Sequence, residues 1–193
     1  MRLILIRHAE TQGNKEKLMT GQYDEGLDAL GKEQAGKLGK RLKGLMVDKF
    51  YVSDLKRARE TAAEIIQFHQ DVPVVYDPRL REQNFGVLEN NTWPEFRLDQ
   101  IKQGVSWIEH KPKNGESVGE LFLRVWDFYL RMEEEGIVVW VTHGGVIAAL
   151  LVQLFNEPIE QFIKHKISNT SVTVIKVDGA AKLVEYNSVS HLD

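Results

Sequence analysis

The first residues of this chain constrain its fold more than any other segment. Residues 3–6 form a short, fully apolar run, Leu-Ile-Leu-Ile, that leads directly into Arg7 and His8. Such a run predicts a buried strand in the centre of a sheet. Open α/β sheets bind ligands outside the carboxyl ends of their strands, so we expect a site at this arginine–histidine pair. Arginine can hold phosphate oxygens while a neutral imidazole attacks phosphorus, which is the combination that phosphoryl transfer requires.

Strand-like and helix-like segments alternate along the rest of the chain. The segments that we expect as strands are residues 49–53, 72–76 and 137–142, with a closing hairpin at 171–177 and 183–186. The segments that we expect as helices are residues 31–45, 57–68, 94–102, 117–132 and 144–155. Pro73 favours an edge strand or the start of a strand, and Ser117 with Glu120 forms a capping-box pattern. The alternation predicts a three-layer α/β/α sandwich with a mainly parallel sheet.

Length and composition restrict the class of protein. With 193 residues and no linker-like or repeated segment, residues 1–193 are expected to form a single domain. The net charge of −3 argues against nucleic-acid and membrane partners, and no apolar run approaches the roughly 20 residues of a membrane helix. The absence of cysteine excludes disulfides, thiolate nucleophiles and thiolate metal sites. Because Met1 and Arg2 lead straight into the first strand, cleaving a leader peptide would remove His8, and we expect a cytoplasmic protein.

Three of the expected strands end in chemically useful residues. In chain order these are Arg7 with His8, Arg57 just after Ser53, and His143 with Gly144 and Gly145. In a parallel sheet the three ends share one edge, where the free N–H groups of two helix N-termini also point. Each group alone has an ordinary interpretation, such as a surface arginine or a tight turn after a strand. Together they predict one anion pocket formed by two arginines, two histidines and main-chain donors.

Residues 7–14, Arg-His-Ala-Glu-Thr-Gln-Gly-Asn, resemble the signature of the histidine phosphatase superfamily, which includes the cofactor-dependent phosphoglycerate mutases. Further patterns of that family follow in order. They are Thr20-Gly21-x-x-Asp24, Ser53-x-Leu-x-Arg57-Ala-x-x-Thr61, Glu82-x-x-Phe85-Gly86 and Thr142-His143-Gly144-Gly145. The resemblance covers most of the chain and implies a phosphoglycerate mutase-like fold. It also selects Arg57 over Lys56 and Arg59 as the second phosphate-binding arginine.

Two departures from the family pattern are visible. Ala9 replaces the usual glycine after the histidine, which exchanges one small residue for another. Leu88 and Asn90 stand where related phosphatases often carry tryptophan and glycine. Asparagine can adopt the left-handed conformation that a glycine would supply, so we expect the local backbone to be kept.

The resemblance implies a two-step transfer through a phosphohistidine. His8 is the expected nucleophile, and it attacks as a neutral imidazole that the neighbouring arginines favour. Arg7, Arg57 and His143 are expected to bind the equatorial phosphoryl oxygens, where charge is spread in the transition state. The expected substrate-binding residues at the rim are Asn14, Thr20, Gly21 and Gly144.

Glu82 is the expected general acid. It would protonate the leaving alkoxide and then act as the base that activates water. The ordinary interpretation of this residue is an ion pair with Arg79 or Arg81. Glu89 and Glu10 are weaker candidates for the acid.

Several functions compete with phosphomonoester hydrolysis. A metal site would need ligand spacing that the histidines and carboxylates of this chain lack, so we expect a metal-independent enzyme without a cofactor. A cofactor-dependent phosphoglycerate mutase is the first alternative, although the compact region after Glu82 favours access of water and hydrolysis. A non-catalytic phosphoprotein-binding module is the second alternative, but it would not need His8 or Glu82. The expected partner is a small-molecule phosphomonoester, with a phosphoprotein as the other possibility, and the oligomeric state is left open.

The substrate is the least constrained property. Residues 90–116 are loosely patterned and carry Trp93, Trp107 and several basic groups, which suits a lid or side wall over the pocket. The two tryptophans could equally anchor this segment to the body of the protein. The turn at residues 115–117 resembles one found in small phosphatases of the family, including those that act on α-ribazole phosphate. The histidines outside the motifs, His69, His110, His165 and His191, are expected to be surface or packing residues.

Overall fold

The computed structural model describes residues 1–132 and 135–193, and six strands in this part of the chain form one sheet. In chain order the strands are β1 (Arg2–Arg7), β2 (Lys49–Val52), β3 (Val74–Tyr76), β4 (Ile137–Thr142), β5 (Val172–Asp178) and β6 (Ala180–Ser188). Their spatial order is β3-β2-β4-β1-β5-β6. The pairs from β3 to β1 are parallel, whereas β5 and β6 are antiparallel additions. The predicted central position of β1 and edge position of β3 are both confirmed.

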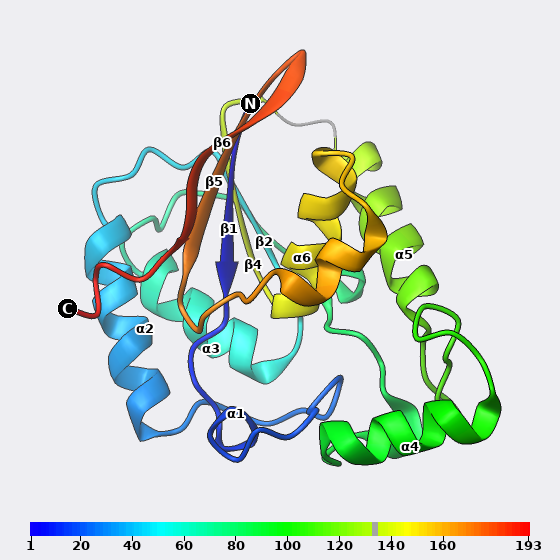
Figure 1. Cartoon of the computed structure of the whole chain (residues 1–193). Coiled ribbons are helices and arrows are strands. Elements are labelled where there is room, and N and C mark those ends of the chain that lie inside the picture. The colour runs from blue at the N-terminus through cyan, green and yellow to red at the C-terminus, as the bar shows by residue number, and fades with distance from the viewer. Residues whose placement is uncertain (133–134) are drawn as a thin grey trace.

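Helices cover both faces of the sheet, which gives the predicted three-layer α/β/α sandwich (Figure 1). The α-helices are α1 (Gln12–Lys15), α2 (Ala29–Leu42), α3 (Lys56–Ile66), α4 (Trp93–Gln103), α5 (Val118–Arg131) and α6 (Gly144–Leu154). Short 3₁₀ segments are η1 (Pro78–Leu80), η2 (Gly86–Leu88) and η3 (Ile159–Lys164). Helices α2 and α3 pack on one face, and α5 and α6 pack on the other (Figure 1).

The apolar run at the start of the chain serves both layers of the core. Leu3 and Leu5 point into the cluster shared with α5 and α6, whereas Ile4 and Ile6 point into the cluster shared with α2 and α3. Successive side chains of a strand alternate between the two faces, so a strand covered on both sides must be apolar throughout. This is why residues 3–6 show no polar alternation.

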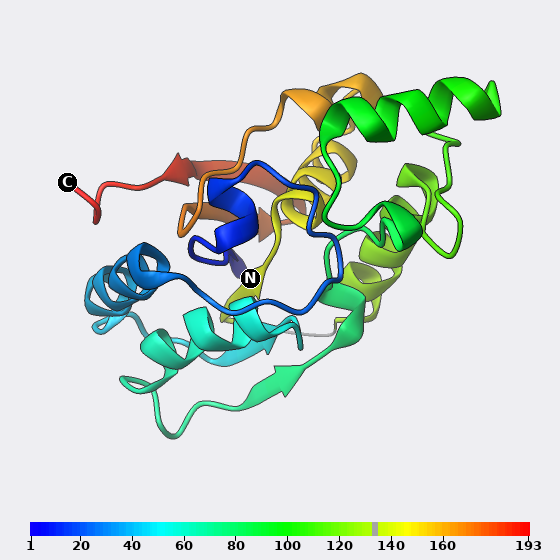
Figure 2. The same ribbon diagram turned by 90° about the horizontal axis from the view of Figure 1, so that it is seen from below.

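The strand ends reach the same edge of the sheet, as the parallel topology requires. Figure 2 looks onto this edge and shows α4 and the segment between β1 and α2 arranged around it. Helix α3 begins just after β2, and α6 begins just after β4. The first turns of both helices therefore lie next to the residues that follow β1.

The structure extends several predicted elements and shifts others. Helix α2 begins at Ala29, two residues before the expected start at 31, because Asp28 caps it by accepting a hydrogen bond from the Gly31 N–H at 2.7 Å. Strand β6 runs over Ala180–Ser188, well beyond the expected 183–186. It is a largely exposed edge strand, so its length left little hydrophobic signal. The Ser117–Glu120 capping box is confirmed.

Candidate active site

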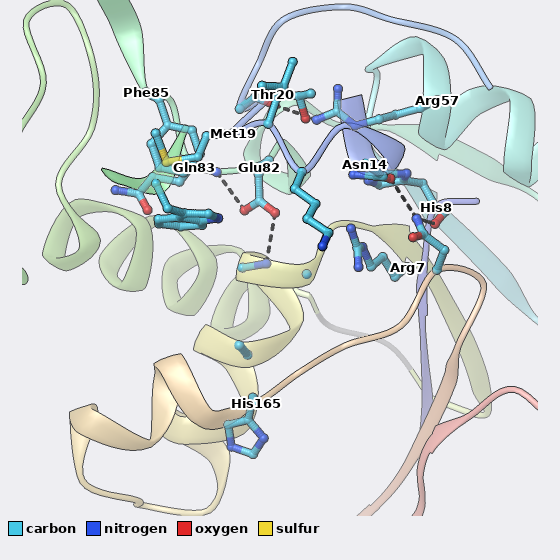
Figure 3. Close-up of a pocket in the computed structure, with 18 of the residues that line it drawn as sticks. Arg7, His8, Asn14, Met19, Thr20, Arg57, Glu82, Gln83, Phe85 and His165 are labelled. Atoms are coloured by element: carbon cyan, nitrogen blue, oxygen red, sulfur yellow. Dashed lines mark hydrogen bonds between the residues drawn. The ribbon is translucent and has the colours of Figure 1, made fainter. Parts of the chain in front are cut away.

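A cavity of about 640 Å³ opens at the carboxyl edge of the sheet (Figure 3). Its lining includes eight of the nine residues that the sequence singles out: Arg7, His8, Asn14, Thr20, Gly21, Arg57, Glu82 and Gly144. The ninth, His143, lies buried beside His8, with the centroids of the two rings 5.0 Å apart. Segments that are distant in the sequence therefore meet around one space.

His8 follows β1 directly and is almost fully buried. Its Nδ1 lies 2.7 Å from the carbonyl oxygen of Ala9. A carbonyl can only accept, so Nδ1 carries the proton and Nε2 keeps its lone pair in the neutral ring. Burial holds the pKa of His8 well below its usual value, and the positive charges of Arg57 and Arg7 lower it further. The side chain is thus a neutral imidazole with an unprotonated Nε2.

Two arginines bring positive charge to the cavity. Arg57, in the first turn of α3, is fully buried and donates to the carbonyl oxygens of Gly21 at 2.5 Å and Tyr23 at 2.9 Å. Arg7 donates to the carbonyl oxygen of Ile167 at 2.6 Å. Burial lowers the pKa of each guanidinium, and their mutual repulsion lowers that of Arg7 further. Each arginine uses part of its donor set to hold a loop, and within the described chain the Nε of each remains without a partner.

His143 follows β4 and is completely buried. Its Nε2 lies 2.8 Å from the hydroxyl of Ser53, at the end of β2. Burial holds the pKa of His143 well below its usual value, with further lowering by Arg57 and His8. The contact gives a structural role to Ser53, the first residue of the Ser-x-Leu-x-Arg pattern. No role could be assigned to this serine from the sequence alone.

Glu82 faces Arg7 and His8 across the cavity (Figure 3). Its carboxylate accepts from the main-chain N–H of Gln83 at 2.9 Å and from that of Gly145 at 3.0 Å. Gly145 lies in the first turn of α6, where unpaired N–H groups favour negative charge. A Cβ at Gly145 would lie 2.3 Å from Glu82 Oε1, so the carboxylate can approach this turn only because the residue is glycine.

The arginines near Glu82 in the sequence have other partners. Arg79 pairs with Asp77 at 2.7 Å, and Arg81 pairs with Asp54 at 2.6 Å. The alternative interpretation of Glu82 as their ion-pair partner is therefore wrong. Arg124 of α5 reinforces the segment by donating to the carbonyl oxygens of residues 79 and 81.

The rim residues are positioned by contacts across the chain. Asn169 donates through its side-chain amide to the carbonyl oxygen of His8 at 3.0 Å and to Asn14 Oδ1 at 2.9 Å. Asn14 therefore keeps its NH₂ group for other acceptors. Gly21 has a φ of +53°, and Glu89 accepts from the next N–H, that of Gln22, at 2.7 Å. Asn90 adopts a φ of +62°, the left-handed conformation expected where relatives often carry glycine.

Sequence reasoning missed much of the outer lining. His165, expected to be a surface or packing residue, lines the cavity while bonded to Glu157 at 2.7 Å. Further lining residues that were not singled out for the pocket are Lys17, Leu18, Met19, Gln83, Phe85, Ala148, Phe162, Ile163 and Asn169. Lys17 lies three residues after the end of the first motif, so a basic residue there was a usable signal. The segment of Phe162 and His165 carries no pattern that marks it, because only long-range folding brings it to the cavity.

The described residues contain neither a cluster of metal ligands nor a membrane-spanning helix. No group of three or more histidine, cysteine, aspartate or glutamate side chains is arranged to hold a metal ion there. Within the same residues, no helix combines the length and the apolar character needed to cross a membrane.

The fold, with a neutral imidazole, two arginines and a carboxylate around one cavity, defines the class of enzymes that transfer phosphoryl groups through histidine. The model of the histidine phosphatase superfamily (branch 1) matches residues 3–188, and this chain belongs to that superfamily. The predicted family, fold and histidine phosphatase chemistry are confirmed.

Similar proteins include both phosphatases and mutases. A probable phosphatase, C1687.21, of Schizosaccharomyces pombe is 32% identical over 100% of this chain and 96% of its own. A 2,3-bisphosphoglycerate-dependent phosphoglycerate mutase of Bartonella henselae is 34% identical over 90% of each chain. The crystal structure of the α-ribazole phosphatase from Shigella flexneri has a TM-score of 0.89 and 30% identity, covering 98% of this chain and 97% of that one.

Proposed function

We propose that this protein hydrolyses small-molecule phosphomonoesters through a phosphohistidine formed on His8. The observation that carries the proposal is the state of His8, whose Nδ1 is committed to the Ala9 carbonyl while Nε2 is left unprotonated beside the cavity. In the first step Nε2 attacks phosphorus and the bond from phosphorus to the ester oxygen breaks. In the second step water attacks the same phosphorus, the P–N bond breaks, and inorganic phosphate leaves.

Arg7, Arg57 and His143 stabilise the transferring phosphoryl group in this proposal. Charge on its equatorial oxygens is best balanced by donors that are already oriented in a site of low water content. The loop bonds of the two arginines provide that orientation. The NH₂ group of Asn14, with Thr20, Gly21 and the main chain at Gly144, supplies neutral donors at the rim.

Glu82 handles the protons in both steps. Its place across the cavity from His8 suits a group that gives a proton to the departing alkoxide and later removes one from the attacking water (Figure 3). The N–H groups of Gln83 and Gly145 hold the carboxyl group in that position. The bonds of Arg79 and Arg81 to other carboxylates leave Glu82 available for this work.

A trapping experiment tests the proposal. Wild-type protein exposed briefly to a ³²P-labelled phosphomonoester and then quenched should carry label that is labile in acid and stable in base. The His8→Ala variant should carry none and lose hydrolysis, whereas His191→Gln, altered outside the cavity, should keep both. Label that persists in His8→Ala would overturn the proposal.

Two further assays separate the alternatives. Release of free phosphate from a phosphomonoester, without isomerisation of 3-phosphoglycerate, is expected, and net conversion of 3-phosphoglycerate to 2-phosphoglycerate would favour the mutase function. Turnover should survive exhaustive chelation, because the proposed steps use only side chains of this chain.

Since a chain without cysteine needs no oxidising compartment, we place this activity in the cytoplasm.

A further inference from the structure

The cavity is larger than the phosphoryl chemistry needs. Its volume of about 640 Å³ is that of a site for a whole small molecule, and the groups given to phosphoryl transfer occupy one end. Most of the remaining lining side chains are apolar, and they include Met19, Phe85, Trp93, Ala148, Phe162 and Ile163. The alcohol part of the substrate must lie against these side chains.

One wall of this outer part is an aromatic cluster. Trp93 meets Phe85 and Phe96 edge to face, with ring centroids 6.1 Å and 5.7 Å away. Phe96 in turn packs at 4.5 Å against the ring of His110. Despite these contacts 59% of Trp93 remains exposed. The part of the indole that these contacts leave exposed is available to a ligand in the cavity.

Helix α4, which carries Trp93, has a defined anchor. It contains no buried residue of its own. His110 is fully buried, and its Nε2 lies 2.8 Å from Asp99 Oδ2 on α4. This contact and the T-shaped packing of Phe96 against the His110 ring fix the helix beside the cavity. The position of Trp93 at the cavity is therefore fixed by specific contacts of its helix.

The second wall comes from η3. Phe162 packs against Phe122 at 5.4 Å and is stacked on Trp107 at 6.2 Å, which places Ile163 at the mouth with 65% of its surface exposed. Of the two interpretations that the sequence left open for the tryptophans, Trp107 follows the first, because it anchors its segment to the body of the protein. Trp93 follows the second, because it forms a side wall of the cavity.

The charges of the outer cavity do not suit a second anionic group on the substrate. Beyond the phosphoryl-binding end, the basic or titratable lining residues in the described chain are Lys17 and His165. His165 already faces the carboxylate of Glu157 at 2.7 Å. A carboxylate or second phosphate on the alcohol would meet one lysine, a histidine that already has a carboxylate partner, and otherwise uncharged side chains. These contacts would offset only part of the free-energy cost of removing the anion from water.

We infer that the outer cavity is a subsite for a planar aromatic group, and that the substrates are phosphomonoesters of uncharged alcohols that carry one. This inference rests on the proposed function and specifies its substrate class. Trp93 is the specificity-determining residue, because it presents a π-surface to the cavity without contributing to the reacting end. An aromatic group can make edge-to-face or offset contacts with this surface. Such contacts are more favourable than those of an aliphatic group of equal size in the same place.

The test compares esters that share a primary alkoxide leaving group, so that intrinsic reactivity is matched. The probes are ethyl phosphate, 2-(decahydro-1-naphthyl)ethyl phosphate, 2-(1-naphthyl)ethyl phosphate and 3-phosphoglycerate. Wild-type kcat/KM should be highest for the naphthyl ester, at least about tenfold above ethyl phosphate. In Trp93→Ala this value should fall about tenfold for the naphthyl ester and less than about twofold for ethyl phosphate. Trp93→Phe should retain most of the preference.

Leu98→Ala is the matched control, since Leu98 lies on α4 and is 56% exposed but does not line the cavity. It should leave all four values unchanged. Equal kcat/KM for the decahydronaphthyl and naphthyl esters, or a preference for 3-phosphoglycerate, would overturn the inference. An equal loss on the naphthyl ester and on ethyl phosphate in Trp93→Ala would also overturn it. If His8→Ala still hydrolysed these esters, the proposed function itself would fail, which is a separate outcome.

Discussion

The hydroxyl of Ser53 and Nε2 of His143 lie 2.8 Å apart and join the ends of β2 and β4 next to the proposed nucleophile. Ser53 is fully buried, so water cannot replace its hydroxyl without rearrangement. The contact fixes the orientation of a ring whose centroid is 5.0 Å from that of His8.

Replacing Ser53 by alanine should therefore impair both catalysis and folding. We expect kcat to fall about tenfold with KM little changed, because the ring of His143 loses its fixed orientation. We expect the free energy of unfolding to fall by about 1–3 kcal/mol, because a buried partner is left unpaired. Steady-state kinetics and thermal unfolding would measure the two effects. Ser171→Ala is the control, because the buried Ser171 hydroxyl has no partner in the described chain. Equal kinetics in both variants would contradict this role for Ser53.

Replacing Glu82 by glutamine should slow phosphoenzyme formation from esters whose leaving group must be protonated more than from esters whose leaving group departs as an anion. The amide keeps the size of the side chain but cannot donate as a carboxylic acid does. Formation of the phosphoenzyme from an alkyl phosphate should slow by about 10²–10⁴-fold. The same step with p-nitrophenyl phosphate, whose leaving group departs unprotonated, should slow far less. Rapid-quench measurement of both esters checks this prediction, and an equal loss on both would remove Glu82 as the acid.

The buried histidines should make stability fall as the pH is lowered. The pKa values of His8 and His143 are held well below the usual value by burial, and that of His191 is lowered to about 4 by the same cause. Below about pH 6.5 these histidines bind a proton in the unfolded protein but stay neutral in the folded protein. Because the unfolded state binds more protons, lowering the pH favours unfolding. Each such group contributes up to about 1.4 kcal/mol per pH unit in the interval between its folded and unfolded pKa values.

Urea unfolding of wild type and His8→Gln between about pH 7 and about pH 5.5 measures this contribution. The carboxylates titrate in both proteins, so their effect cancels in the comparison. The variant should lose less stability over the interval than wild type does. Parallel curves would mean that His8 is not held neutral in the folded state.

Two glycines on α2 form a matched pair for stability. A Cβ at Gly39 would lie 2.0 Å from the main-chain carbonyl oxygen of Glu64 on α3, whereas a Cβ at Gly36 would meet nothing within 4 Å. Gly39→Ala should cost about 1–3 kcal/mol, because the two helices must move apart. Gly36→Ala should stabilise the protein by about 0.5–1 kcal/mol, because alanine loses less backbone entropy in a helix. Chemical denaturation of both variants tests the close packing of α2 on α3.

The parts of the site that could be predicted from sequence lie directly after strands. Arg7, His8 and His143 each follow an apolar run, and parallel pairing brings such ends to one edge whatever the loops do. Asn169 shows the opposite case. It bonds to Asn14, 155 positions away, from a segment without regular structure, and no local pattern announces that contact. Glu82 lies between these two cases. Its presence at the site could be predicted from its sequence motif, but its hydrogen bonds with Gln83 and Gly145 could not.

The sequence by itself determined the layered α/β architecture and the gathering of the proposed phosphate-binding groups, because side-chain periodicity and the alternation of strands with helices are local properties of the chain. Only the tertiary structure decided how those groups are oriented, which proton His8 carries and which side chains face the alcohol part of a substrate. Orientation depends on hydrogen bonds and burial between distant segments, and these exist only once α4, η3 and the strand ends have packed around the same cavity.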